Sequence, residues 1–267
     1  MSTIIHVAVA GAIGRMGQEV VKMVLADPEL KLVAAIDRAS EGADIGRIVG
    51  KEECGVAVSG DLEQALLSGQ ADVLVDFTTP HSVVANAKIA IRNKVRPVIG
   101  TTGFTPETIE ELDKLCLSYG IGGIIAPNFS IGAILMMKFA AQAAKYMPHV
   151  EIIEYHGDQK LDAPSGTSIK TAELIAQNRQ ELRQGNPKEE ETIEGSRGGY
   201  YNGFRIHSVR LPGVFAQQEV IFGGDGQTLK IRHDSYERSG YMPGVNLAVK
   251  KVQGVSGIVY GFEHFID

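Results

Sequence analysis

The sequence predicts an α/β protein: an N-terminal doubly wound, Rossmann-type parallel sheet, then a second α+β domain built on a mixed or antiparallel open-faced sheet. Short β-branched runs alternate with longer amphipathic stretches through the first half, which is typical of parallel strands joined by crossover helices. A glycine-rich turn follows the first apolar run. After His149 the pattern changes to alternating runs separated by glycine turns, which favours a sheet with one open face.

Each element of the first half follows from its apolar pattern. Strands are expected at 4–10, 31–36, 56–58, 72–77, 96–99 and 122–126. Helices are expected at 15–26, after the capping residue Asp61 to 67, at 81–93, from Thr105-Pro106 onward, and at 131–147. The last helix is almost wholly apolar, so we expect it to lie buried between two layers. The rest of 41–60 is expected to be a loop.

The second half begins with a strand at 150–155 and a helix at 167–182, followed by a charged, glycine-rich segment at 184–199. Strands at 204–211, 218–222 and 228–233 would build the open-faced sheet, which could pair between subunits. A helix at 243–252 and a strand at 257–265 close the chain, and we expect them to return to the first domain.

Composition excludes several classes of function. The 267 residues carry 26 basic and 32 acidic side chains, for a formal charge of −6, which disfavours nucleic acid as a partner. The first apolar run follows no basic segment and breaks at Gly11, and no stretch reaches the ~18 apolar residues of a membrane span, so we expect neither a signal peptide nor a membrane partner. Cys54 and Cys116 have no CxxC spacing and no neighbouring histidine, which predicts no metal site and a reducing, cytoplasmic location.

A glycine loop joins the first strand to the first helix. Gly11-Ala12-Ile13-Gly14-Arg15-Met16-Gly17 has GxxGxxG spacing, which lets the backbone approach a pyrophosphate at a helix N-terminus. Such turns also occur where nothing binds. However, Asp37 lies 20 residues beyond Gly17, at the end of the second predicted strand, where an acid would bind the adenosine ribose. Arg38 could instead contact the 2′-phosphate of NADP or be an ordinary solvated arginine.

Three further loops follow predicted strands. They are Phe77-Thr78-Thr79-Pro80, Gly100-Thr101-Thr102-Gly103 and Ala126-Pro127-Asn128-Phe129. In doubly wound sheets this edge is the ligand crevice, so we expect the loops to flank the nicotinamide. Each loop taken alone could be simple turn chemistry.

One segment beyond His149, in the second half of the chain, combines candidate proton carriers with a turn suited to binding an anion. His156 suits proton transfer near neutral pH, and Lys160 adds a cation. Ser165, Gly166 and Thr167 place hydroxyls and backbone N–H groups at a helix N-terminus, which suits a carboxylate. Singly, these residues could be a helix cap and surface charges. A hydrolase using Ser165, His156 and Asp162 is disfavoured, since the serine lacks a GxSxG elbow.

These motifs together resemble the 4-hydroxy-tetrahydrodipicolinate reductase (dihydrodipicolinate reductase) family. The resemblance rests on the glycine loop, Gly100-Thr101-Thr102-Gly103-Phe104, Ala126-x-Asn128-Phe129-Ser130, and the run Glu154-x-His156-x-x-x-Lys160-x-Asp162-Ala163-Pro164-Ser165-Gly166-Thr167. Ile206-His207-Ser208-Val209-Arg210-Leu211-Pro212-Gly213 and Met242-Pro243-Gly244-Val245 extend it over nearly the whole chain.

The resemblance implies an enzyme of lysine and diaminopimelate biosynthesis that uses NADH or NADPH to reduce a small cyclic dicarboxylate. It further implies that His156 and Lys160 handle protons, that Ser165 to Thr167 bind a substrate carboxylate, and that the protein is a homotetramer joined through the second-domain sheet. We therefore expect residues 1–129 with 240–267 to bind the dinucleotide and residues 130–239 to bind substrate and build subunit contacts.

Two positions depart from the family pattern. Gly157 stands where a second histidine usually contacts substrate, and Gln217 stands where a histidine is usual. Gly157 offers no side-chain donor, so we expect lower turnover or substrate affinity unless Tyr155 or Gln159 compensates. Two other readings stay open from the residues alone: a reductase of another small carboxylate, and a nucleotide-binding redox sensor, which would not need Lys160 or the carboxylate turn.

Overall fold

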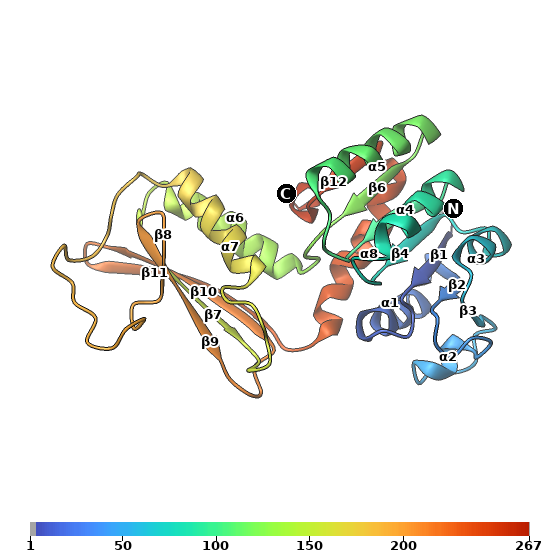
Figure 1. Ribbon diagram of the computed structural model, residues 1–267, viewed down its shortest axis with the longest axis horizontal. Helices are drawn as coiled ribbons and strands as arrows, with labels where there is room; N and C mark the ends of the chain where they lie inside the picture. The colour runs from blue at the N-terminus through green and yellow to red at the C-terminus, as the bar shows by residue number, and fades with distance from the viewer. Residues whose placement is uncertain (1–3, 267) are drawn as a thin grey trace. The chain divides into compact units, whose positions relative to one another are not determined.

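A computed structural model describes residues 4–266, and the chain forms two compact units (Figure 1). Unit 1 combines the chain up to Ser130 with the segment from Tyr241 onward, and unit 2 is Ile131–Gly240. Each unit has its own sheet with its own helices.

Unit 1 contains a seven-stranded sheet in the order β12-β6-β5-β4-β1-β2-β3. Every neighbouring pair is parallel, which confirms the predicted Rossmann-type sheet. The strands are β1 (Ile5–Ala10), β2 (Leu30–Ile36), β3 (Val58–Ser59), β4 (Val73–Asp76), β5 (Arg96–Ile99), β6 (Gly122–Ile125) and β12 (Gly257–Tyr260). The C-terminal strand β12 pairs with β6.

Helices cover both faces of this sheet. They are α1 (Arg15–Ala26), α2 (Ile45–Ile48), α3 (Leu62–Gly69), α4 (Val83–Arg92), α5 (Pro106–Tyr119) and α8 (Met242–Lys251). Helices α3, α4 and α5 adjoin one another in sequence order, and α1 packs beside α8. Lys250 on α8 holds Asp27 at the end of α1 through an Nζ–Oδ2 contact of 2.8 Å, which fixes the returning C-terminal segment.

The strand order reverses between β1 and β4, and two loops meet there. Gly11 has a φ of +74°, and a Cβ atom on it would lie 2.6 Å from the carbonyl oxygen of Phe77. A Cβ on Gly17 would lie 2.0 Å from the carbonyl oxygen of Gly11. Both positions therefore require glycine, because a side chain would collide with backbone. The carboxyl ends of strands at such a reversal form the ligand crevice of doubly wound sheets.

Unit 2 contains a five-stranded mixed sheet in the order β11-β10-β7-β9-β8. The strands are β7 (His149–His156), β8 (Gly199–Tyr201), β9 (Phe204–Arg210), β10 (Ala216–Gly224) and β11 (Gln227–Ser235). Strand β7 is antiparallel to β10 and parallel to β9. Helices α6 (Ile131–Ala144) and α7 (Gly166–Asn178) pack together on one face, as Figure 1 shows.

The burial of β7 alternates because only one face of this sheet is covered. Val150, Ile152 and Glu154 are buried, whereas Glu151 and Ile153, which point to the other face, are half-buried. The second sheet is therefore mixed and open-faced, as predicted.

Several details differ from the sequence-based prediction. The loop at 41–60 contains the one-turn helix α2, whose N-terminus is capped by the Asp44 side chain accepting from the Arg47 N–H. Strand β8 was not predicted. The apolar helix α6 is not buried all round, since the Phe139 side chain is 53% exposed. The last strand stops at Tyr260, because Gly261 has a φ of +100° and a 3₁₀ turn follows.

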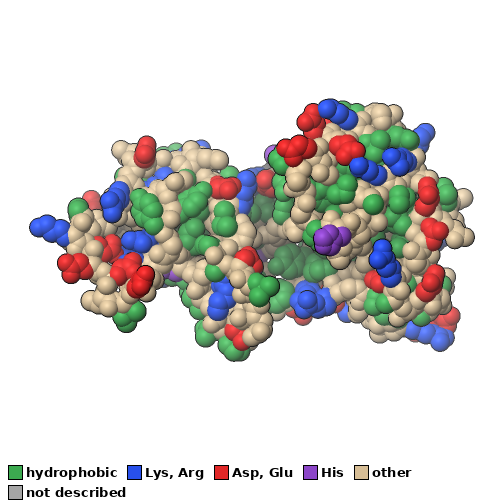
Figure 2. All heavy atoms as spheres, in the orientation of Figure 1, with side chains coloured by type: hydrophobic (Ala, Val, Ile, Leu, Met, Phe, Trp, Pro, Cys, Tyr) green, Lys and Arg blue, Asp and Glu red, His purple; other side chains and the backbone are tan. Residues whose placement is uncertain are grey.

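Acidic and basic side chains are interspersed over the visible surface of each unit (Figure 2). Within residues 4–266, none of the helices combines the length and apolar character that a membrane crossing requires. The same residues contain no group of three or more His, Cys, Asp or Glu side chains that could hold a metal ion.

Candidate functional site

The glycine loop of unit 1 is bonded to the acid at the end of β2. The Asp37 carboxylate accepts hydrogen bonds from the backbone N–H of Ile13, with an N–Oδ2 distance of 3.2 Å, and of Ala39, with an N–Oδ1 distance of 3.1 Å. Ala12 is buried, Met16 is half-buried, and Arg15 and Arg38 are exposed. The structure thus brings the loop and Asp37 together and leaves the two arginines in solvent.

Asp76, at the end of β4, joins the two threonine loops and was not singled out from the sequence. Its carboxylate accepts from the Thr78 hydroxyl (2.6 Å), the Asn86 amide (2.8 Å) and the Thr101 hydroxyl (3.2 Å). The residue is 1% exposed, and burial raises its pKa while these hydrogen bonds lower it. The Thr78 and Thr101 hydroxyls therefore bond to Asp76 within the protein. The groups that these loops can offer a ligand include their backbone N–H and carbonyl groups.

Aromatic rings close the rest of this rim. A Cβ on Gly100 would lie 2.1 Å from the Phe77 ring, so glycine lets the loop pack on that ring. The Phe77 and Phe129 ring centroids are 6.1 Å apart. Asn128 Oδ1 accepts from the Ser130 N–H at 2.8 Å, which shapes the turn after β6. Ala126 is buried, whereas Thr102 and Pro127 are exposed.

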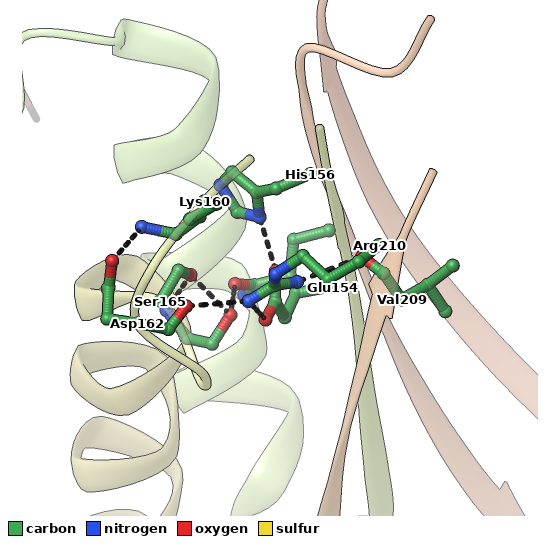
Figure 3. A network of polar contacts seen from close by, with 9 residues as sticks. Glu154, His156, Lys160, Asp162, Ser165, Val209 and Arg210 are labelled. Atoms are coloured by element: carbon green, nitrogen blue, oxygen red, sulfur yellow. Dashed lines mark hydrogen bonds and ion pairs between the residues drawn. The ribbon is translucent and has the colours of Figure 1, made fainter. Parts of the chain in front are cut away.

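In unit 2, β7 ends in a connected set of charged side chains (Figure 3). The His156 Nδ1 atom contacts the carboxylate of Glu154, which is fully buried. The Lys160 ammonium lies 2.6 Å from Asp162 Oδ1. Arg210, on β9, donates from Nη2 to both Glu154 Oε1 and the Asp162 carbonyl oxygen, each at 2.8 Å. The predicted proton carriers thus share one network.

Ser165 caps α7 through a buried relay of hydrogen bonds. Its Oγ accepts from the Ser168 N–H at 3.2 Å and lies 2.9 Å from Ser168 Oγ. Ser168 Oγ donates its proton to Gln218 Oε1 at 2.6 Å. The proton between the two serines must therefore come from Ser165, because each hydroxyl has only one. The Ser165 hydroxyl is engaged within the protein, and the turn presents backbone N–H groups at the helix N-terminus, including that of Gly166.

The two family departures lie in different places. Gly157 directly follows His156, and a Cβ there would lie 3.3 Å from the Val214 carbonyl oxygen. Gln217 pairs with Tyr155 across β10 and β7, and its Oε1 accepts from Arg232 Nη2 at 3.0 Å. Gln217 therefore points to the open face, whereas Glu154 points to the opposite, buried face.

Sequence reasoning did not identify Arg210 or Asp76 as part of these sites, and it gave Glu154 no role. Arg210 lies 56 residues from Glu154 along the chain, so no local pattern links them. For Asp76 a signal exists, since an acid at the end of an otherwise apolar strand precedes two threonines.

The glycine loop at the strand-order reversal, Asp37 behind it, and a second unit with the candidate proton carriers His156 and Lys160 are typical of a two-domain NAD(P)H-dependent oxidoreductase. Family models narrow this class. "Dihydrodipicolinate reductase, N-terminus" matches residues 5–129, and "Dihydrodipicolinate reductase, C-terminus" matches residues 132–266. The chain belongs to the dihydrodipicolinate reductase family.

Individual relatives agree with this assignment. The chain is 52% identical to the 4-hydroxy-tetrahydrodipicolinate reductase of Geobacillus kaustophilus, over 98% of this chain and 99% of that one. It is 54% identical to the reductase of the same name from Halalkalibacterium halodurans, over 98% and 100% of the two chains. A dipicolinate-bound dihydrodipicolinate reductase from Paenisporosarcina sp. TG-14 superposes with a TM-score of 0.87 at 47% identity, covering 98% and 99%.

Proposed function

We propose that this chain reduces 4-hydroxy-tetrahydrodipicolinate to tetrahydrodipicolinate with loss of water, in lysine and diaminopimelate biosynthesis. In this reaction the dicarboxylate substrate, one NAD(P)H and one proton give tetrahydrodipicolinate, NAD(P)⁺ and water. The observation that carries the proposal is that one loop of a chain of this family holds Lys160, which shares a network with His156, and the turn at Ser165 that opens α7.

Unit 1 is proposed to bind the dinucleotide, which supplies a hydride when bound. The fit rests on Gly11 and Gly17, where the absence of a side chain lets the loop turn tightly into the N-terminus of α1, the place where a pyrophosphate binds in such folds, and on Asp37 for the ribose hydroxyls. The proposed contacts are Gly11, Ala12, Ile13, Gly14, Arg15, Met16, Asp37, Arg38, Phe77, Thr78, Gly100, Thr101, Thr102, Ala126, Pro127, Asn128 and Phe129.

Unit 2 is proposed to bind the substrate. Ser165, Gly166 and Thr167 would hold one carboxylate at the N-terminus of α7, where backbone N–H groups and the helix dipole favour an anion. Lys160 would add a cationic contact and donate a proton, and His156 would donate or accept one. Asp162 now pairs with Lys160, so a substrate carboxylate would compete with Asp162 for that ammonium.

The test mixes the purified protein with NADPH or NADH and the condensation product of pyruvate and aspartate semialdehyde. We expect the nicotinamide absorbance to fall, and we expect Lys160→Met to slow its fall by about 10²-fold or more. Unchanged absorbance with folded protein would contradict the proposal and would favour a nucleotide-binding sensor.

Arg38 offers a test of cofactor choice. Removing its guanidinium in Arg38→Ala should weaken NADPH by about 10- to 150-fold, because a charge-assisted contact to the 2′-phosphate is worth about 1.5 to 3 kcal/mol. NADH should be affected much less, since it lacks that phosphate. Steady-state KM values for both cofactors measure the difference, and equal weakening would reject this role for Arg38.

We further propose a cytoplasmic homotetramer joined through the open face of the unit 2 sheet. Support comes from half-buried apolar side chains on that face, among them Ile153 and Ile221, beside charged ones such as Glu219 and Arg232. A mixed surface of this kind suits pairing between copies. Sedimentation of the purified protein tests the proposal, and a monomer at micromolar concentration would contradict it.

A further inference from the structure

The buried carboxylate beneath His156 has the geometry of a device that orients an imidazole. We propose that Glu154 and Arg210 are positioning residues: Glu154 holds Nδ1 of His156 so that Nε2 carries the proton of the reaction, and Arg210 holds both Glu154 and the substrate loop. The inference rests on the proposed function, in which His156 handles a proton. Neither residue is proposed to touch the substrate.

The contact with Glu154 sets the orientation of the His156 ring. Glu154 Oε2 contacts Nδ1, and in Figure 3 the second ring nitrogen points away from Glu154. A carboxylate can only accept, so Nδ1 must carry a hydrogen. In the neutral ring the free lone pair is then on Nε2, and this nitrogen is the one that exchanges a proton with the reacting molecule.

Glu154 carries a negative charge although its side chain is 0% exposed. Burial raises the pKa of this carboxyl group, but hydrogen bonds from His156, Arg210 and Ser208 outweigh burial and bring the pKa to about 2. The carboxylate therefore stays ionised at neutral pH. An ionised carboxylate can only accept a hydrogen bond, so it holds the Nδ1–H of the neighbouring ring, as in a Ser-His-Asp triad.

Arg210 contacts both the Glu154 carboxylate and the loop that holds Lys160. Its Nη2 atom has two hydrogens, and both are used: one reaches Glu154 Oε1 and the other the Asp162 carbonyl oxygen, each at 2.8 Å. Asp162 in turn binds the Lys160 ammonium at 2.6 Å. One guanidinium thus ties the strand that holds His156 to the loop that holds Lys160.

The charged groups near the ring come from three elements. Glu154 lies on β7, Arg210 lies on β9, and the loop supplies the Lys160–Asp162 pair. Strand β10 places the uncharged Ala216 beside His156. Replacing Glu154 with glutamine would remove the charged acceptor of the ring and leave Arg210 without its carboxylate partner.

The first experiment measures kcat/KM against pH for Glu154→Gln, with Glu151→Gln as the matched control. Glu151 lies on the same strand and also contacts a histidine and an arginine, but on the open face. For Glu154→Gln we expect kcat to fall about 10- to 100-fold and the pH profile of kcat/KM to change, because the ring loses the charged acceptor that fixes its tautomer. Glu151→Gln, compared at the same oligomeric state because Glu151 lies on the proposed subunit face, should keep the wild-type profile, and Glu154→Asp, which retains the charge, should restore it.

A second variant separates the two contacts of Arg210. Arg210→Met should lower kcat and also raise the substrate KM about 10-fold, because it releases the Asp162 carbonyl as well as Glu154. Glu154→Gln should lower kcat with little change in substrate KM. Identical effects of the two variants on KM would reject the double role of Arg210.

The second experiment needs no change to Glu154. The imidazole ¹⁵N shifts of His156, assigned by their loss in His156→Gln, report which nitrogen is protonated in the neutral ring. We expect Nδ1–H, and an Nε2–H ring would overturn the inference, as would a wild-type pH profile in folded Glu154→Gln. Should the wild type fail to oxidise NADPH with the substrate, the proposed function fails while these shifts still decide the tautomer.

Discussion

Two Glu–His–Arg networks lie on opposite faces of the unit 2 sheet, and both begin on β7. Glu154 contacts His156 and Arg210 beneath the helices, while Glu151 contacts His207 and Arg197 on the open face. The side chain of Glu154 is 0% exposed, against 28% for Glu151.

The neighbours of the two networks differ more than their composition. Arg210 continues to the loop of Lys160, beside the carboxylate turn, whereas Arg197 continues to Glu189 on the surface. Of the two, the first network holds the proposed proton carrier His156 and the cation Lys160, and its loop leads into the helix N-terminus that we propose binds a carboxylate. Burial and neighbours, and not the three residue types, make one of them a candidate site.

Removing each histidine in turn tests whether the two networks differ in function. His156→Gln should lower kcat by about 10²- to 10⁴-fold, the usual loss when a general acid or base is removed. His207→Gln should stay within about twofold of wild type, because its network carries no proton of the reaction. Steady-state rates at matched assembly check both. Losses of similar size would mean that the two networks do not differ in function.

The two networks should also differ in how they stabilise the fold at low pH. The pKa of Glu154 is about 2 in the folded chain against an ordinary 4.5, so its stabilising contribution is complete above pH 4.5 and disappears as pH falls through 2. The free energy of unfolding of wild type should exceed that of Glu154→Gln by about 3 kcal/mol near pH 7, and the gap should close toward pH 2.

The pKa of Glu151 is also lowered by its hydrogen bonds with Arg197 and His207, which outweigh burial. Its effect has the same sign, but it should be smaller because solvent screens a partly exposed pair. Urea unfolding of wild type, Glu154→Gln and Glu151→Gln from pH 2 to 7 makes the measurement. A gap for Glu154→Gln that stays constant with pH would contradict a depressed pKa.

The sequence predicted elements with strong local signals. Helix 15–26 and strand 96–99 have the predicted bounds, because apolar periodicity and flanking turn residues define them. Helix α2 was missed since a single turn has too few residues for a periodic pattern, and the terminal strand was overextended past Gly261. The exposed Phe139 shows that apolar content alone does not report burial.

The candidate site divides in the same way. His156, Lys160 and the Ser165 turn could be predicted because one continuous segment carries them. The partners that give them order could not, since Arg210 comes from β9 and Gln218 from β10. Asp76 collects Thr101 from 25 residues away, a contact that only the sheet creates.

The smallest expected effect comes from adding a second imidazole beside the first network. Gly157→His requires a shift of a few tenths of an ångström away from the Val214 carbonyl, which the loop should tolerate. A new donor to the substrate should lower the substrate KM by about 2- to 10-fold. Turnover and KM that match wild type would show that Gly157 does not limit the reaction.

Transfer of deuterium from NADPH tests directly whether this chain reduces 4-hydroxy-tetrahydrodipicolinate. Wild-type protein is given NADPH carrying two deuterium atoms at C4 of the nicotinamide, together with the pyruvate–aspartate semialdehyde condensation product, and the product is weighed by mass spectrometry. We expect tetrahydrodipicolinate that is one mass unit heavier than the unlabelled product. Consumption of NADPH without deuterium in that product would contradict it.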